Sequence, residues 1–411
     1  MASDRRAGFA AAWAVGEFRA LWVAEAQSIV GDQLAKVALS VVVYSRTGSA
    51  GLAALSYAAL LLPALVSGPL LSWIADAYPR RTVMTWCAVV QAGLVALMAI
   101  PQMPTAALFA LIVLVQLVQA PFAAAQASVL PVVLSGEPYQ AAQALRQITR
   151  QTAMLLGLGG GGLAVAWMGV SWALALDAAT FVVAAIVIVL GVRHRSPASS
   201  VADGDNRGGF WSAAVLIWRD QRLRSLVALA WLAGFAVVPE GLAAPFATAL
   251  GAGPQAVGWL LAADPAAMAV GAFLLVRFVR VEARLRWMGP LAIMTVVPLL
   301  GYAARPGLAA ALVLLAISGA CAAYQVTAVA TFMDWVPDAQ RARAFGAARG
   351  GLVAAQGLGV LGGGLVAELT GSVTTTVALA GAAGLLVAVP AAVAWHRAYT
   401  RHSLLVGTGV R

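Results

Sequence analysis

Long apolar stretches alternate along this chain with short polar or charged segments. About twelve of the stretches run for roughly 18–25 residues, which is enough for an α-helix to cross a hydrocarbon core about 30 Å thick. Backbone polar groups in lipid need internal partners, so we expect continuous helices, whereas a membrane β-barrel would need short alternating segments. The expected spans are 19–44, 50–73, 82–101, 105–127, 143–167, 171–192, 223–247, 254–279, 286–303, 308–333, 345–369 and 373–395.

Composition agrees with this pattern of spans. The chain is 62% hydrophobic and only 10% charged, whereas soluble domains are about 25% charged. A chain so poor in polar residues cannot cover its own surface with them, so its solvent is predicted to be a lipid bilayer. Glu17 and Arg19 interrupt the first apolar stretch before it reaches spanning length, so we expect no cleavable signal and a retained first helix.

The distribution of arginines predicts orientation in the membrane. The net charge of +10 could suggest a nucleic-acid partner, but 23 of the 25 arginines fall on one side of the predicted topology, and only Arg46 and Arg305 fall on the other. Arginine-rich connections remain in the cytoplasm. We therefore expect a multi-pass protein of the cell membrane with both termini cytoplasmic and no nucleic-acid partner.

The sequence also repeats internally. Residues 153–162 and 355–364 share an alanine, a glycine and a closing Gly-Gly pair at an offset of 202, and Pro63 and Pro265 have the same offset. Such self-similarity predicts a duplicated unit of six helices. The predicted division is 1–192 for the first bundle, 193–221 for a cytoplasmic linker and 222–411 for the second bundle.

The predicted linker and the duplication carry a functional hypothesis. The linker is rich in serine, glycine and aspartate, and its end, Phe210 to Trp218, is expected to be a short amphipathic segment on the inner face. Two helical repeats joined in this way are typical of transporters that rock about a site near the midplane. The alternative is another helical membrane protein that happened to duplicate.

A charged loop at 72–84 carries a family resemblance. It resembles the first signature of the major facilitator superfamily, Gly-x-Leu-Ala-Asp-Arg-x-Gly-Arg-Arg/Lys, with Asp76, Arg80 and Arg81 in register and departures at Ser72, Ala77 and Pro79. The resemblance implies an all-α membrane protein with twelve transmembrane helices in two pseudo-symmetric six-helix bundles.

The same loop has a physical role that can be argued from its residues. Adjacent guanidinium groups and a nearby helix N-terminus would stabilise the Asp76 carboxylate. With Arg80 and Arg81, it is predicted to act as a conformational latch. The alternative is a topology-setting loop with a capping acid.

The fifth span resembles the antiporter signature Gly-x-x-x-Gly-Pro-x-x-Gly-Gly of proton-coupled drug and siderophore exporters. Gly157, Gly161 and Gly162 match the signature, while Ala153 and Leu158 do not. The resemblance implies export. By themselves, the glycines predict a close-packing helix surface.

Charged residues inside the spans are candidates for proton coupling, because a charge near the bilayer centre costs about 2.5–3.5 kcal/mol. In the first span, Glu25, Ser28, Asp32 and Lys36 share one helical face, and Lys36 is the only lysine of the chain. Asp32 and Lys36 are therefore candidates, although Lys36 could instead extend outward with Asp32 neutralising it.

Glu240 and Asp264 are the candidates in the second half. Alignment of the two repeats places Glu240 opposite Ala35, which is next to Lys36. We expect Lys36 and Glu240 to pair when the outer side of the protein is closed. Asp264 precedes Pro265, which frees carbonyl groups and kinks the helix. Asp177 and Asp334 are weaker candidates.

Amides and hydroxyls within the spans are candidates for contact with a substrate. They are Gln116, Gln119, Tyr324, Gln325 and Thr327. In the resembling fold, the spans that carry them line the central cavity. The alternative is that these groups hold helices together.

The inventory of reactive groups excludes an enzyme. The sole lysine follows Ala35, so the chain has no Gly-x4-Gly-Lys-Ser/Thr phosphate-binding motif, and the three histidines form no metal or triad arrangement. We expect no cofactor and no bound metal.

The sequence therefore predicts a monomeric secondary transporter that exports a small apolar or amphipathic compound in exchange for protons. Its partners are that small-molecule substrate, protons and the bilayer. The alternatives are an importer or lipid-translocating facilitator of the same fold, and a non-transporting sensor or scaffold.

Overall fold

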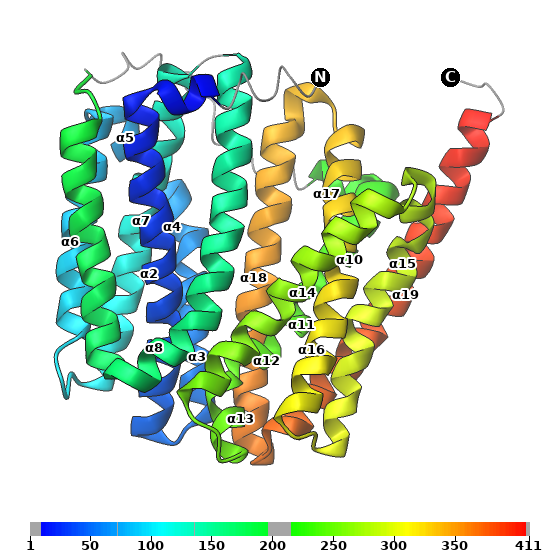
Figure 1. The fold of residues 1–411 in the computed structure, drawn as a ribbon. Helices are drawn as coiled ribbons and strands as arrows, with labels where there is room; N and C mark the ends of the chain where they lie inside the picture. The colour runs from blue at the N-terminus through cyan, green and yellow to red at the C-terminus, as the bar shows by residue number, and fades with distance from the viewer. Residues whose placement is uncertain (1–9, 72, 135, 196–214, 408–411) are drawn as a thin grey trace. The chain divides into compact units, whose positions relative to one another are not determined.

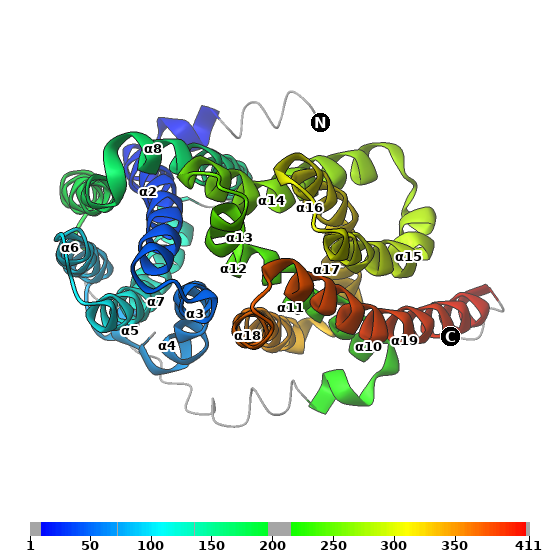
Figure 2. The same ribbon diagram turned by 90° about the horizontal axis from the view of Figure 1, so that it is seen from below.

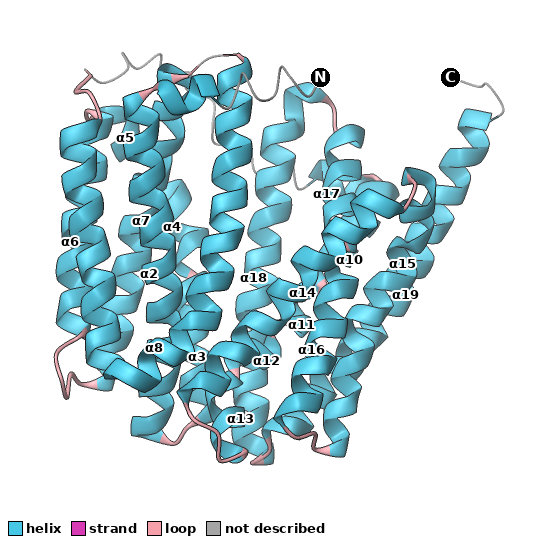
Figure 3. Cartoon of the chain, viewed as in Figure 1, coloured by secondary structure: helices cyan, strands magenta, loops and turns pink. Residues whose placement is uncertain are grey.

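In the computed structural model the described residues, 10–71, 73–134, 136–195 and 215–407, form helices joined by short loops and no β-strand (Figure 3). Eleven helices in these ranges are long and apolar enough to cross a membrane. One of them lies in α8 (Glu137–Gly191), where Gly169 adopts φ 81° and ψ 166° and divides the helix into two spans. The predicted all-α membrane fold is confirmed.

Residues 1–47, 59–202 and 253–258 form the first compact unit. Figures 1 and 2 both place α2 (Gly16–Thr47) alongside α8, and Leu21, Ala24 and Ile188 are buried together with residues from the neighbouring helices. The other helices of this unit are α4 (Pro63–Leu71), α5 (Ile74–Ala77), α6 (Arg80–Met98) and α7 (Thr105–Val133).

Residues 48–58, 203–252 and 259–411 form the second compact unit. Its core includes Leu229, Met288, Tyr324 and Trp395. Its helices are α10 (Gln221–Trp231), α11 (Ala233–Ala236), α12 (Val238–Gly241), α13 (Ala243–Ala249), α15 (Val281–Leu300), η1 (Gly301–Ala304), α16 (Leu308–Ala322), α17 (Tyr324–Trp335), α18 (Asp338–Thr370) and α19 (Val373–Gly407).

Two helices are divided between the units. The start of α3 (Ala50–Leu61) belongs to the second unit, and the start of α14 (Pro254–Phe278) belongs to the first. The predicted boundaries of two six-helix halves at 192 and 222 stay a prediction. Most of the predicted linker, 196–214, lies outside the described residues, as does the first part of the predicted amphipathic segment.

The first membrane span of the second repeat is broken into short helices. Between 221 and 249 the chain forms α10, α11, α12 and α13 in succession, and Pro239 lies in the first turn of α12. Proline has no N–H to continue the hydrogen-bond ladder and crowds the preceding turn. Glu240 is thereby carried on a four-residue helix at a break in the span.

The internal repeat reappears in the surroundings of its glycines. A Cβ on Gly162 in α8 would lie 2.6 Å from the carbonyl oxygen of Pro254, and a Cβ on Gly364 in α18 would lie 2.5 Å from the Cβ of Ala54. Gly160 and Gly362, two residues earlier in each repeat, have no atom within 4 Å of such a Cβ. In both repeats, the last glycine of the segment therefore packs against a neighbouring helix, and the glycine two residues earlier faces open space.

Candidate functional site

A cavity of about 240 Å³, lined by both polar and apolar side chains, lies inside the first unit. The cavity brings together four of the predicted site residues: Asp32 and Lys36 from α2, and Gln116 and Gln119 from α7. Helical spacing puts the first two on one face, and i, i+3 spacing does the same for the two glutamines. We refer to this space as the first-unit cavity.

Residues from other helices complete the first-unit cavity. Gln91 in α6 donates from Nε2 to Oε1 of Gln119 at 2.7 Å. Asp177 in α8 is 2% exposed, lines the same cavity and interacts electrostatically with Asp32. Gly31 leaves room for the Asp177 carboxylate, since a Cβ there would collide with it. The structure thus places Asp177, a weaker sequence candidate, beside a stronger one.

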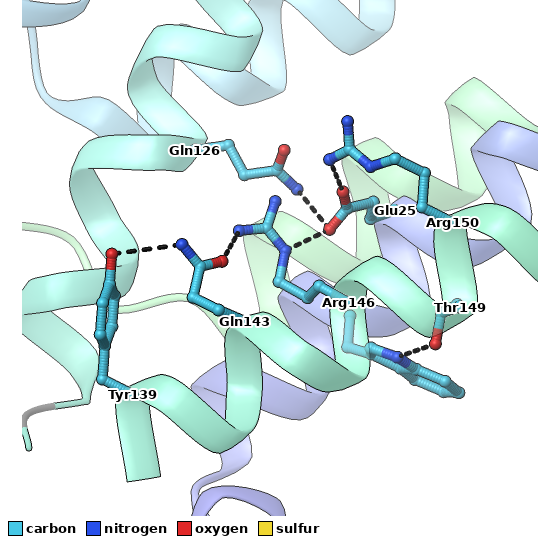
Figure 4. A network of polar contacts seen from close by, with 8 residues as sticks. Glu25, Gln126, Tyr139, Gln143, Arg146, Thr149 and Arg150 are labelled. Atoms are coloured by element: carbon cyan, nitrogen blue, oxygen red, sulfur yellow. Dashed lines mark hydrogen bonds and ion pairs between the residues drawn. The ribbon is translucent and has the colours of Figure 1, made fainter. Parts of the chain in front are cut away.

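A second cluster in the first unit joins α2 to α8 through Glu25 (Figure 4). Its Oε2 accepts from Nε of Arg146 at 2.5 Å, and its Oε1 accepts from Nη2 of Arg150 at 2.6 Å. Glu25 is 8% exposed, so both bonds shield a carboxylate that would otherwise be costly to bury. Nε2 of Gln126 also donates to Oε2 of Glu25 at 3.5 Å, and Nη1 of Arg146 donates to Oε1 of Gln143 at 3.2 Å.

In the second unit, Glu240 is held by a residue that the sequence did not single out. Tyr57 of α3 donates its hydroxyl hydrogen to Oε2 of Glu240. Asp264 of α14 interacts electrostatically with both residues. Lys36 belongs to the first unit and Glu240 to the second, and the expected ion pair between them stays a prediction.

The N-terminus of α3 has a further contact in the second unit. Oε1 of Glu368 in α18 accepts from the Ser49 hydroxyl and from the Gly51 backbone N–H at 2.9 Å. A carboxylate at a helix N-terminus satisfies backbone donors that lack an intrahelical partner. The start of α3 is therefore tied to α18 by Glu368 and to α12 by Tyr57.

A cavity of about 320 Å³ lies wholly within the second unit, and we refer to it as the second-unit cavity. Its wall comes from α10, α17 and α18, and it is mainly apolar. The predicted substrate residue Gln325 lies in the wall together with Gln356 and with Arg349, one of the predicted cytoplasmic arginines.

The other candidates on α17 point into the protein core. Tyr324 is fully buried and donates its hydroxyl hydrogen to the Leu229 carbonyl at 2.6 Å. Thr327 is 8% exposed, and its carbonyl accepts from the Thr331 hydroxyl at 2.8 Å. Neither Tyr324 nor Thr327 lies in the wall of the second-unit cavity.

The predicted latch residues lie on α5 and at the start of α6. Arg80 donates to the carbonyl of Ser128 in α7 at 2.9 Å, and Arg81 donates to that of Val189 in α8 at 2.6 Å. Both arginines thus bind helix ends within the first unit. The side chain of Asp76, like Ser72, lies outside the described part of the structure, so the latch stays a prediction.

The glycines of the antiporter-like segment pack directly on α2 and on the start of α14. A Cβ on Gly157 would lie 2.7 Å from Gln33 Cβ, and one on Gly161 would lie 3.2 Å from Val37 Cγ2. Gly162 faces Pro254 in the same way. Substitution by a larger residue would separate these helices.

Together, the apolar helices, the repeated glycine faces and the carboxylates buried within spans define a polytopic membrane transporter. The chain belongs to the Major Facilitator Superfamily, whose sequence profile matches residues 21–246 and 241–408. It is a transporter and not an enzyme. No curated protein matches the sequence.

Solved structures of transporters share the fold at low sequence identity. A variant of the nucleoside transporter NupG is 14% identical, with a TM-score of 0.73 over 93% of this chain and 100% of that one. A bacterial homolog of the human lysosomal transporter Spinster, in an inward-facing and unoccupied conformation, is 15% identical with a TM-score of 0.67 over 93% and 95%. A bacterial homologue of the iron transporter ferroportin, inward-facing, is 13% identical with a TM-score of 0.70 over 92% and 98%.

Proposed function

We propose that this chain exports a small amphipathic compound in exchange for protons, by alternating access. The observation that carries the proposal is the hydrogen bond from Tyr57 to Glu240. Tyr57 comes from the second span of the first repeat, and Glu240 from the first span of the second. A movement that separates α3 from α12 has to break this bond.

Protonation of Glu240 would weaken that contact. A hydroxyl that donates to an ionised carboxylate forms a charge-assisted bond, roughly twice as strong as its neutral counterpart. The contact is therefore strongest when Glu240 is ionised, and proton binding favours its release. Asp264, close enough to interact with Glu240, offers a second carboxylate for the same proton.

The first-unit cavity supplies a matching pair of carboxylates in the other unit. Asp32 and Asp177 interact electrostatically there, beside Lys36 and the amides of Gln91 and Gln119. Ionisable groups within membrane spans generally mark ion or substrate pathways. Both units therefore offer acids for coupling to protons, while the direction of export rests on the resemblance of the glycine segment to the antiporter signature.

The test is transport by purified protein in proteoliposomes under an imposed pH gradient. We expect Glu240→Gln to abolish proton-driven substrate movement, and Tyr57→Phe to reduce it by about tenfold, since a bond to a charged group contributes about 1.5–3 kcal/mol. The matched control is Glu282→Gln, because Glu282 is an exposed acid in the first turn of α15. The double variant that combines Tyr57→Phe with Glu240→Gln should show no less proton-driven transport than Glu240→Gln alone.

Other outcomes would favour the alternatives. Substrate movement down its own gradient without proton flux would make the protein a facilitator, and binding without any flux would make it a sensor. Full proton-driven activity of a folded Glu240→Gln protein would rule out the proposed role of Glu240.

A further inference from the structure

The mainly apolar wall of the second-unit cavity carries one formal charge. Arg349 lies in the wall, with Phe332 and Phe345 among the apolar residues around it. Among the described residues, the Arg349 guanidinium forms no hydrogen bond or ion pair. Arg349 is an exposed residue, so its guanidinium is accessible to a ligand in this cavity.

Two amides accompany Arg349 in the cavity. Gln325 on α17 and Gln356 on α18 both line it, and within the described structure neither side chain has a hydrogen-bond partner. Three polar side chains on two helices therefore present hydrogen-bond donors to one apolar space. A few polar groups within an apolar pocket are typical of small-molecule sites, which span about 300–1,000 Å³. At about 320 Å³, this cavity is at the small end of that range.

We propose that the second-unit cavity binds an amphipathic organic anion, a carboxylate or sulfonate carried on an apolar ring or short chain. The planar guanidinium of Arg349 would bind the acidic group through two parallel hydrogen bonds, a geometry that arginine favours. The apolar body would contact Phe332, Phe345 and Leu226. The inference rests on the proposed transport function and names its substrate class.

The charge balance of the two cavities supports this assignment. The first-unit cavity has Asp32, Asp177 and Lys36 in its wall, and therefore has more acidic than basic groups. The second-unit cavity has Arg349 and no acid among its lining residues. We therefore assign anion binding to the second-unit cavity and proton binding to the acids of the first-unit cavity.

Equilibrium binding separates this inference from the transport proposal, because it requires neither a gradient nor a conformational cycle. The probes are naphthalene-2-carboxylate, the neutral naphthalene-2-carboxamide and the cationic 2-(aminomethyl)naphthalene, measured by equilibrium dialysis against the full chain in nanodiscs of zwitterionic lipid. We expect the carboxylate to bind at least tenfold more tightly than either analogue. We also expect Arg349→Gln to weaken carboxylate binding at least tenfold, while leaving carboxamide binding within twofold.

Three further variants, two on α18 and one on α10, serve as controls. Arg343→Gln removes an exposed arginine of the same helix outside the cavity wall and should leave binding unchanged. Arg349→Lys keeps the charge without the planar fork and should recover part of the affinity. Leu226→Gln should weaken all three probes together, because it removes apolar contact and not charge.

Three other results would overturn the inference. Equal binding of the three probes, or carboxylate binding that survives Arg349→Gln in folded protein, would show that the charge does not select the ligand. Loss of carboxylate binding in nanodiscs with 30% anionic phospholipid would assign the site to a lipid. Anion-selective binding in a protein that shows no proton-driven transport would instead keep this site and reject the proposed function.

Discussion

At the scale of single residues, the carboxylates within the spans of this chain differ in what binds them. Glu25 is bound by two arginines that lie one helical turn apart on α8, whereas Glu240 is bound by the Tyr57 hydroxyl. Through these two guanidinium groups, the Glu25 carboxylate joins α2 to α8. We therefore expect a structural role for Glu25, while Glu240 stays the proposed site of proton exchange.

The structural role of Glu25 can be tested by neutralising it. Breaking a buried ion pair costs about 3–5 kcal/mol, because it leaves uncompensated charge, and we expect Glu25→Gln to fall at the low end since Arg150 is half-exposed. Equilibrium unfolding in mixed micelles measures the loss. Glu282→Gln should be within about 0.5 kcal/mol of the parent protein. Equal stability of the Glu25 and Glu282 variants would contradict the structural role.

At the scale of helices, the glycine segments of α8 and α18 form close packing surfaces. Each repeat has one glycine against a neighbouring backbone or alanine and another, two residues earlier, that is exposed. A periodicity argument cannot separate these two glycines, because both lie in apolar sequence. The contacts with Pro254 and with the start of α3 make the distinction.

This difference predicts opposite effects of one substitution at two neighbouring positions. Gly162→Ala should destabilise the protein by about 1–3 kcal/mol, as overpacking does, because the new methyl group meets the Pro254 carbonyl. Gly160→Ala should be neutral or stabilising by up to about 1 kcal/mol, since alanine is the better helix former. Thermal unfolding of both variants in detergent provides the comparison. Similar melting temperatures for the two would refute this packing assignment, and Gly364→Ala against Gly362→Ala repeats the experiment in the other unit.

At the scale of the whole molecule, arginines have two distinct roles. Most lie in the predicted cytoplasmic connections, where we expect them to set the orientation in the membrane. Arg80 and Arg81 also bind carbonyl groups of α7 and α8, Arg146 and Arg150 bind Glu25, and Arg349 lines a cavity. A count of charges predicts the first role and is silent on the second.

The predicted orientation can be measured by cysteine accessibility. In a background with Cys87→Ala and Cys321→Ala, Gly307→Cys between η1 and α16 should react with a membrane-impermeant maleimide in intact cells. Glu282→Cys at the start of α15 should react only after the cells are permeabilised, because it lies beside Arg280 and Arg284 in a predicted cytoplasmic loop. Both positions are exposed. Labelling in the reverse order would invert the topology.

The sequence by itself determined the membrane fold, the number of spans and part of the candidate site. Span length and lipid energetics predict the helices, and helical spacing alone brings Asp32 and Lys36 to one face, and Gln116 and Gln119 to another. These are local relations along one helix. They hold whatever the rest of the chain does.

Only the tertiary structure decided which helix faces meet. Tyr57 is 183 residues from Glu240, and Arg146 is 121 residues from Glu25, so no local pattern pairs them. The first-unit cavity that joins Asp32 to Asp177, and the second-unit cavity around Arg349, depend on helices from distant parts of the sequence. A side chain in an apolar span can face lipid, a neighbouring helix or a cavity, and only packing against other helices selects among the three.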